Sequence, residues 1–151
     1  MQKTIVSDTS CLILLEKIGS LELLRSAYSE ITIPSVVASE FGSTLPPWIN
    51  VEDPSTESYD KVVRYRIDPG EISAIALALD LDDCLLIIDD LRGRLVAESF
   101  GIRVTGTLGV LIEAKRSGDI PAIKPLIEKI QATNFRLSED LIEQVLRRVN
   151  E

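Results

Sequence analysis

Short apolar segments alternate along this chain with longer segments of helical periodicity. The segments typical of strands are KTIVS, EITIP, CLLII and IRVTG, at residues 3–7, 30–34, 84–88 and 102–106. Apolar residues at helical spacing predict helices over residues 9–18, 20–28, 35–41, 69–81, 91–100, 107–118, 121–131 and 138–149. Strands that alternate with helices form sheets of mostly parallel strands. The sequence therefore predicts an α/β fold, a three-layer α/β/α sandwich around a mostly parallel central sheet.

The length of 151 residues is that of one ordinary domain. Residues 42–60 are rich in Pro, Ser and Thr and are predicted to be an irregular loop, in which WINV forms a short extended piece. No repeat or linker divides the chain. We therefore expect a single domain over residues 1–151, with C-terminal helices within residues 121–151.

Histidine is absent from the sequence. This excludes nucleophile pairs and metal centres that use an imidazole, so the chemistry must come from carboxylates, hydroxyls, Lys or Arg. The net charge of −8 does not favour holding nucleic acid by bulk attraction. It suits an acidic pocket that collects cations, a basic protein partner, or merely a soluble surface.

Cys11 and Cys84 lie in apolar runs without metal-ligand spacing, which predicts that both are core residues. No apolar run approaches the ~18 residues that a membrane helix needs. The early charges Asp8 and Glu16 are unlike the apolar segment of a signal peptide. We expect a cytoplasmic protein with no membrane attachment.

Carboxylates follow two of the predicted strands. Asp8 comes after the strand at 3–7, and the pair Asp89 and Asp90 comes after the strand at 84–88. Ligands of open α/β sheets bind beyond the carboxyl ends of the strands, so these side chains share one edge if the two strands are close in the sheet. Adjacent residues of a strand point in opposite directions, so either Asp89 or Asp90 could face the cleft.

Two glutamates are expected to join this acidic edge. Glu40 follows Val36 and Val37 at helical spacing, and Glu71 precedes Ala74 and Ile75 in the same way, so both are predicted on inward helix faces. The alternative for each acidic residue is local. Asp8, Asp89 or Asp90 could cap a helix, and DPGE at 68–71 has the form of a capping box.

Several carboxylates in one place repel one another unless protons or a cation intervene. Hard cations with oxygen ligands, Mg²⁺ or Mn²⁺, fit such a set. A divalent ion held at the edge of an α/β sheet favours phosphodiester chemistry, in which the ion polarises the phosphate and activates a water.

The order of the motifs SDTSCLILLEKIGSLELL, IPSVVASE, GEISAIALA and IDDLRGRLVAESFGIRVTGTLGVLIEAK resembles the PIN-domain family over roughly residues 3–145. The resemblance implies a small metal-dependent ribonuclease similar to the toxins of prokaryotic toxin–antitoxin pairs. It implies catalytic or metal-binding roles for Asp8, Glu40, Glu71 and Asp90 or Asp89, with Mg²⁺ or Mn²⁺ as cofactor. The toxins more often have Asp at the position of Glu71.

The resemblance also implies that Thr9 or Ser10 orients a ligand or a water, for which helix capping is the alternative. Arg92 and Arg94 lie close to the acidic edge in sequence and could hold phosphates of the RNA substrate, although Arg94 could instead pair with Glu98. An antitoxin protein with a basic segment is a further expected partner. A homodimer through residues 107–149 is also expected.

Two other classes of protein compete with this interpretation. A phosphoacceptor receiver domain shares an acidic pair after a strand, but the residues after Asp90 lack its further acceptor Asp at a strand end. A catalytically weak module that binds nucleic acid or protein and regulates a partner remains open. Binding of Mn²⁺ through Asp8 distinguishes an enzyme from such a module.

Overall fold

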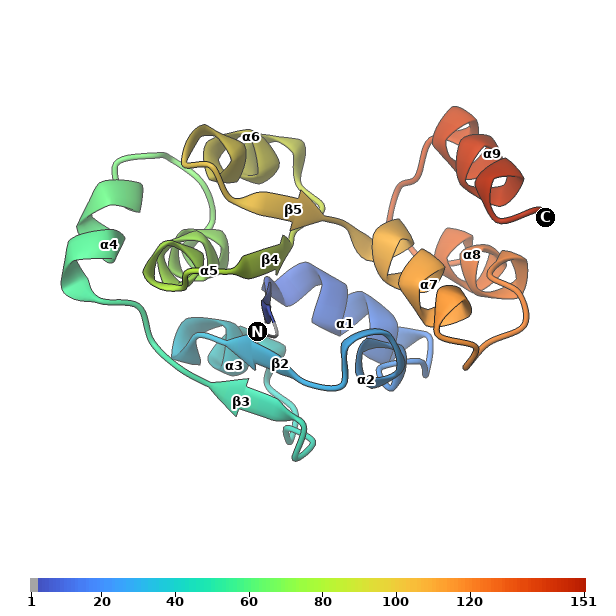
Figure 1. Ribbon diagram of the computed structural model, residues 1–151, viewed down its shortest axis with the longest axis horizontal. Helices are drawn as coiled ribbons and strands as arrows, with labels where there is room; N and C mark the ends of the chain where they lie inside the picture. Colours follow the sequence, from blue (N-terminus) through green and yellow to red (C-terminus); the bar gives the residue numbers. More distant parts are fainter. Residues whose placement is uncertain (1–2) are drawn as a thin grey trace.

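The computed structural model describes residues 3–151, in which five strands form one entirely parallel sheet in the order β3-β2-β1-β4-β5 (Figure 1). The strands are β1 (Thr4–Ser7), β2 (Ile31–Ile33), β3 (Ile49–Val51), β4 (Cys84–Ile87) and β5 (Arg103–Thr105). The helices are α1 (Thr9–Lys17), α2 (Leu23–Tyr28), α3 (Ser35–Phe41), α4 (Thr56–Val62), α5 (Pro69–Asp80), α6 (Leu91–Ser99), α7 (Thr107–Arg116), α8 (Lys124–Gln131) and α9 (Glu139–Arg148). The predicted α/β/α sandwich is confirmed, and every strand is parallel to its neighbours.

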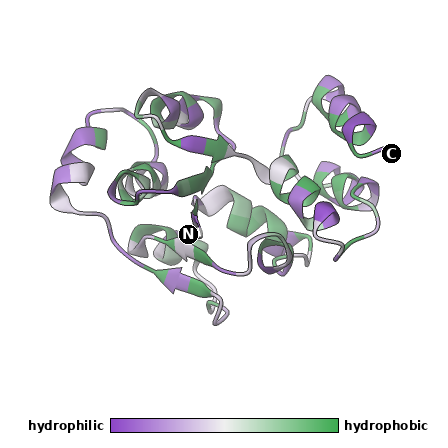
Figure 2. Ribbon diagram, viewed as in Figure 1, coloured by the Kyte–Doolittle hydropathy of each residue, from purple (hydrophilic) through white to green (hydrophobic). Residues whose placement is uncertain are grey.

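Strand residues alternate between two apolar clusters, one on each face of the sheet. Ile5 and Ile87 belong to a cluster that includes residues of α1, α2, α3 and α7, whereas Val6 and Leu86 belong to one formed with α4, α5 and α6. Figure 2 shows β4 and most of α1 in the green of hydrophobic residues. This two-sided burial explains why the β4 segment is a continuous apolar run rather than an alternating one.

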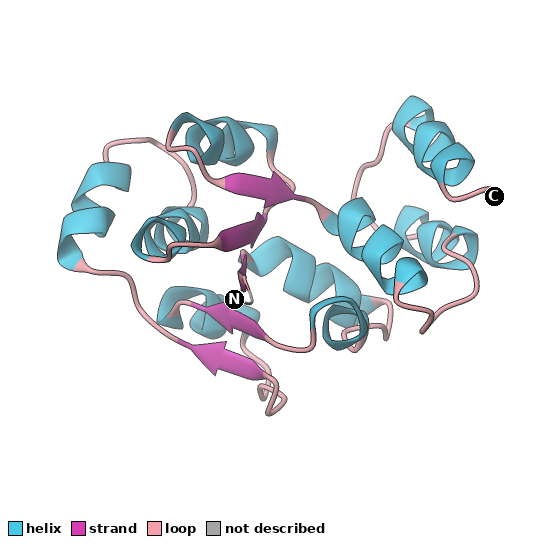
Figure 3. Cartoon of the chain, viewed as in Figure 1, coloured by secondary structure: helices cyan, strands magenta, loops and turns pink. Residues whose placement is uncertain are grey.

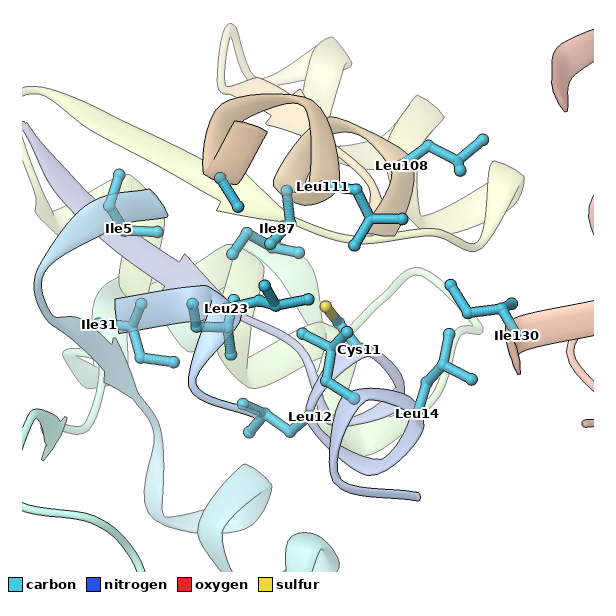
Figure 4. Close-up of a cluster of buried hydrophobic side chains, with 14 of the residues drawn as sticks. Ile5, Cys11, Leu12, Leu14, Leu23, Ile31, Ile87, Leu108, Leu111 and Ile130 are labelled. Carbon is cyan, nitrogen blue, oxygen red and sulfur yellow. The ribbon is translucent and has the colours of Figure 1, made fainter. Parts of the chain in front are cut away.

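The first cluster is centred on α1 (Figure 4). Cys11 lies in it with Ile87 and Leu111, and no part of Cys11 is exposed. Cys84 is also buried, and both thiols are free. The prediction that the cysteines are core residues is therefore confirmed.

The prediction of an irregular loop over residues 42–60 is wrong from Thr56 onward. The WINV segment does contain a strand, β3, but α4 begins at Thr56. Ser55 caps α4 by accepting a hydrogen bond from Ser58 N. Asp80, at the end of α5, in turn accepts hydrogen bonds from Ser55 N and from the hydroxyls of both serines. A carboxylate distant in the sequence thus completes a helix start that the Ser- and Thr-rich composition concealed.

Helices α8 and α9 lie beyond α7, at the end of the molecule away from the strands (Figure 3). Ile127 and Val145 of these helices belong to the first apolar cluster. The Glu151 carboxylate accepts hydrogen bonds from Ile123 N and Lys124 N, at 2.8 and 3.0 Å, at the start of α8. The single-domain organisation stays a prediction, which this shared apolar cluster supports. No helix within residues 3–151 is long and apolar enough to span a bilayer.

Candidate functional site

Strands β1 and β4 are neighbours in the sheet, and their last residues, Ser7 and Ile87, are paired in register. Asp8 follows directly and donates its backbone N–H to Ile87 O at 3.0 Å. Asp89 lies two residues beyond Ile87 at the same edge. The predicted meeting of carboxylates from these two strands therefore follows from their adjacency in the sheet, which the sequence alone left open.

Asp8 is almost completely buried, with 1% of its surface exposed. It caps α1, because Oδ1 accepts from Cys11 N at 3.3 Å and Oδ2 accepts from Ser10 Oγ at 3.1 Å. Burial raises the pKa of Asp8 from 3.8 to about 7, and the charge of Asp89 adds to this rise, against the two hydrogen bonds that lower it. The carboxylate is thus held in place by neutral donors that do not fully offset the loss of water.

Asp89 and Asp90 have different partners. Asp89 accepts hydrogen bonds from Thr107 N and Thr107 Oγ1, at 2.9 and 2.6 Å. Asp90 caps α6 by accepting from Gly93 N at 3.0 Å. The charge of Asp89 acts on Asp8, whereas the charge of Asp90 acts on Glu71. Each member of the pair therefore interacts with a different carboxylate of the site.

Glu71 forms the predicted capping box with Asp68, whose backbone N–H it accepts at 3.4 Å. It is nonetheless buried, with 8% of its surface exposed. Burial, followed by the charge of Asp90, raises the pKa of Glu71 from 4.5 to about 7. Asp8 and Glu71 therefore each take part in a helix cap and also belong to the acidic group.

Glu40 corrects one detail of the prediction. The buried face of α3 is formed by Val37 and Phe41, while Val36 and Glu40 lie on the exposed row beside it. Glu40 therefore does not point into the interior. It lies at the rim of the site instead, where its Oε1 accepts a hydrogen bond of 2.6 Å from Thr9 Oγ1.

A pocket of about 320 Å³ opens at this edge. Five of the predicted site residues line it, namely Asp8, Thr9, Ser10, Glu40 and Glu71. The other four, Asp89, Asp90, Arg92 and Arg94, are not among the residues that line it. A larger hollow of about 580 Å³ lies near the amino ends of β1 and β2, and none of the predicted site residues lines it.

Three glycines leave room for three of the carboxylates. A Cβ on Gly70 would clash with Glu40 Oε1, one on Gly106 would lie 2.6 Å from Asp89 Oδ1, and one on Gly93 would lie 3.2 Å from Glu71 Oε2. Each glycine lies in the first turn, or at the cap, of a helix that begins at this edge, namely α5, α7 or α6. Sequence reasoning missed these residues, although each stands one to three positions from a polar residue of the site.

Sequence reasoning also missed Thr107, which is completely buried and holds both oxygens of Asp89. Its position offered a signal, because it follows β5 at the same edge of the sheet. The alternative pairing of Arg94 with Glu98 is absent from the ion pairs of residues 3–151. Arg94 Nη1 lies instead beside Asp89, since a Cβ on Gly106 would be 3.1 Å from that nitrogen and 2.6 Å from Asp89 Oδ1.

The donor set of the site consists only of oxygens, and the six ion pairs of the described residues involve none of its carboxylates. Within residues 3–151, no three such side chains are already arranged to hold an ion together. Mg²⁺ keeps several waters and requires only one or two carboxylates from the protein. The residues present therefore fit Mg²⁺ or Mn²⁺.

A parallel five-stranded sheet with carboxylates gathered at its carboxyl edge defines a class of α/β proteins with an acidic site beyond the strand ends. The family model described as a PIN domain matches residues 4–151, so this chain belongs to the PIN-domain family. Members of this family are generally nucleases that act on nucleic acid and typically bind divalent metals. Among curated proteins, none matches the chain.

Proposed function

We propose that this protein is an endoribonuclease of PIN type that depends on Mg²⁺ or Mn²⁺. The observation that supports this most is the group formed by Asp8, Asp89 and Glu71, which come from separate parts of the chain. The pKa of Asp8 and that of Glu71 are both raised to about 7, and no cationic side chain within residues 3–151 pairs with either of them. A bound cation relieves the repulsion between neighbouring carboxylates. Carboxylates that are gathered without a cation are typical of functional sites.

In this proposal Asp8 and Glu71 hold the ion, with Asp89 and Asp90 next to them. A bound divalent ion supplies positive charge that polarises the phosphate and lowers the pKa of a water. Ser10 and Thr107 fix the orientation of Asp8 and Asp89 through the hydrogen bonds described above. Carboxylates must lose their protons before they bind a metal, so binding should strengthen as the pH rises through 7.

Glu40 and Thr9 have a different role in this proposal. Their hydrogen bond joins α3 to α1 across the mouth of the pocket. Glu40 is exposed, so it reaches solvent-borne ligands more readily than Asp8 does. We assign to Glu40 the positioning of water or of the substrate strand, with Thr9 fixing its carboxylate.

We further propose a cytoplasmic toxin of a toxin–antitoxin pair, active as a homodimer. An acidic pocket favours a basic antitoxin segment as the inhibitor that covers it, by charge complementarity. A regulatory module without catalytic activity is the second candidate, because the carboxylates also serve as helix caps. Metal binding and RNA cleavage distinguish the two candidates.

The test is cleavage of single-stranded RNA by purified protein in Mn²⁺. Wild type should cleave, and Asp8→Asn should lose nearly all activity and most of its Mn²⁺ affinity in calorimetric titrations. Asp82→Asn is the matched control, since Asp82 is exposed and makes no hydrogen bond through its side chain within residues 3–151. Equal trace activity in wild type and Asp8→Asn would assign the cleavage to a contaminant and reject the proposal.

A further inference from the structure

Cys11 is a buried residue to which the proposed function assigns no role. It lies in the first turn of α1, and no part of it is exposed. Its backbone N–H donates to Asp8 Oδ1 at 3.3 Å, so the residue is in direct contact with one carboxylate of the site. A cysteine buried among apolar residues commonly only fills space. A role at the site therefore requires a further contact, made by its thiol.

The thiol of Cys11 makes such a contact with Thr107. A side-chain hydrogen bond joins the two residues. Thr107 and Leu111 are four residues apart and share a face of α7, and Leu111 belongs to the apolar cluster that contains Cys11. In Figure 4 the sulfur of Cys11 lies on the side of α1 toward Ile87, the last residue of β4. The thiol therefore reaches from α1 to the first turn of α7.

The hydrogen atoms of this contact have one consistent arrangement. The hydroxyl of Thr107 donates to Asp89 Oδ2 at 2.6 Å, so its only proton is already used. The hydroxyl oxygen can still accept, because it has two lone pairs. Burial, followed by the charge of Asp89, raises the pKa of the Cys11 thiol well above its ordinary value, so the thiol keeps its proton. The S–H group of Cys11 therefore donates to Thr107 Oγ1.

Cys11 thus belongs to a hydrogen-bond chain between two carboxylates of the site. Its N–H binds Asp8 and its S–H binds Thr107, whose hydroxyl binds Asp89. Thr107 N also donates to Asp89 Oδ1 at 2.9 Å, so both oxygens of that carboxylate depend on where Thr107 lies. Hydrogen bonds in a buried chain polarise and strengthen one another. A change at the thiol should therefore alter the position of Asp89.

We propose that Cys11 is a positioning residue, whose thiol holds Asp89 in place beside Asp8 through the hydroxyl of Thr107. Cys11 contacts neither the ion nor the substrate in this arrangement. Loss of a group that orients a metal ligand typically weakens metal affinity by about 10-fold to 100-fold. The consequence for the ion rests on the proposed function, because Asp8 and Asp89 belong to the proposed metal site. The hydrogen-bond chain itself concerns the metal-free protein.

Two substitutions at Cys11 distinguish positioning from space filling. Cys11→Ser keeps a donor at this position and Cys11→Ala removes it, while both keep the backbone N–H that binds Asp8. In calorimetric titrations, Cys11→Ala should bind Mn²⁺ about 10-fold more weakly than wild type, and Cys11→Ser should stay close to wild type. A residue that only fills space gives the opposite order, because serine is less suited than alanine to a helix and to an apolar cluster.

Cys84 provides the matched control. It is also buried, but it begins β4 and so lies at the opposite end of that strand from Asp89. Cys84→Ala and Cys84→Ser should both leave the Mn²⁺ affinity unchanged. Circular dichroism and thermal unfolding of all four variants verify the fold.

A double-mutant cycle with Thr107→Val tests whether Cys11 acts through Thr107. In the Thr107→Val background, Cys11→Ala should have no further effect on Mn²⁺ affinity, because the chain is already broken. Residues that act through one contact give non-additive effects in such a cycle. The same cycle measured by denaturant unfolding in EDTA should also be non-additive, and it requires no metal.

The inference is overturned if Cys11→Ala binds Mn²⁺ as tightly as Cys11→Ser, or if the effects of Cys11→Ala and Thr107→Val simply add in EDTA. A wild type that binds no Mn²⁺, with a non-additive cycle in EDTA, would reject the proposed function and leave the hydrogen-bond chain standing. Mn²⁺-dependent cleavage that is lost in Asp8→Asn, with wild-type Mn²⁺ affinity in Cys11→Ala, would do the opposite.

Discussion

The hydroxyl of Thr9 donates a hydrogen bond of 2.6 Å to Glu40, and this bond joins the first turn of α1 to the last turn of α3. Gly70 lies directly beneath it, because a Cβ there would be 2.8 Å from Thr9 Oγ1 and closer still to Glu40. The mouth of the pocket is thus formed by the ends of α1, α3 and α5. These ends can approach one another because Gly70 has no side chain.

Gly70→Ala should therefore displace the Thr9–Glu40 pair. Glu40 is flexible and exposed, so we expect a stability loss below about 1.5 kcal/mol. In the proposed function Glu40 positions water or the substrate strand, so Mn²⁺-dependent RNA cleavage should fall by about 10-fold or more when its supporting hydrogen bond is lost. Cleavage assays and thermal unfolding measure the two effects. Thr9→Val should reproduce the loss of cleavage and Thr9→Ser should not, and equal cleavage rates in all three variants would contradict this account of the pocket mouth.

The metal-free protein should become less stable as the pH rises. The pKa of Asp8 is raised from 3.8 to about 7 and that of Glu71 from 4.5 to about 7, so folding favours the protonated form of both. The stability that these two protonated carboxyl groups contribute is fully present below their unfolded pKa values. It is lost as the pH rises through about 7. Because one pKa unit corresponds to about 1.4 kcal/mol, we expect the free energy of unfolding to fall by at least about 2 kcal/mol between pH 5 and pH 8.

Unfolding in EDTA at a series of pH values measures this decline. Asp8→Asn should flatten it, and Mn²⁺ added at pH 8 should restore stability in wild type only. A stability that rises between pH 5 and pH 8 in the metal-free protein, and in Asp8→Asn alike, would show that these carboxylates do not repel one another as described.

Thr107→Val should destabilise the protein by roughly 1.5–3 kcal/mol, the usual cost of losing a buried hydrogen bond to a charged group. The hydroxyl of Thr107 is fully buried and donates to Asp89 Oδ2 at 2.6 Å. Valine keeps the shape but leaves that oxygen without its donor. Chemical denaturation at pH 8 provides the measurement. Thr105→Val is the control on the neighbouring strand, because its hydroxyl makes no hydrogen bond within residues 3–151, and its effect should be smaller.

Glu151→Ala should loosen the C-terminal helices without affecting the site. The Glu151 carboxylate accepts from Ile123 N, Lys124 N and Lys115 Nζ, and its side chain is 12% exposed. We expect a loss of about 1–3 kcal/mol, since Ile123 N and Lys124 N lose their partner, whereas Lys115 Nζ keeps Val149 O. Hydrogen exchange should locate the change in α8 and α9. Glu143→Ala breaks an exposed pair and should cost less than about 1 kcal/mol. A parallel loss of Mn²⁺ affinity in Glu151→Ala would indicate coupling to the pocket.

The sequence predicted the elements whose apolar pattern is strong and local. The buried run before Asp89 and the capping box at Asp68 and Glu71 both appear where they were expected. Helix α4 was missed because Asp80, distant in the sequence, completes its start. Glu40 was misplaced because helical spacing identifies a row of residues but not which of two adjacent rows is buried.

The site was predictable as a list of acidic residues and not as a geometry. That Asp8 and Asp89 interact depends on β1 and β4 being neighbours, which is a property of the strand order. The role of Thr107 depends on β5 lying next to β4. Such long-range adjacency has no local signature in a single sequence.

The register between β1 and β4 determines both the core packing and the geometry of the acidic site. A slip of one residue would exchange Leu86 and Ile87 between the two apolar clusters and would also move Asp89 away from Asp8. Correct strand alignment and a competent cation site are therefore one and the same structural condition. In the proposed function, affinity for Mn²⁺ would therefore serve as a quality-control assay for refolded protein, because molecules with a misaligned sheet should fail to bind the ion.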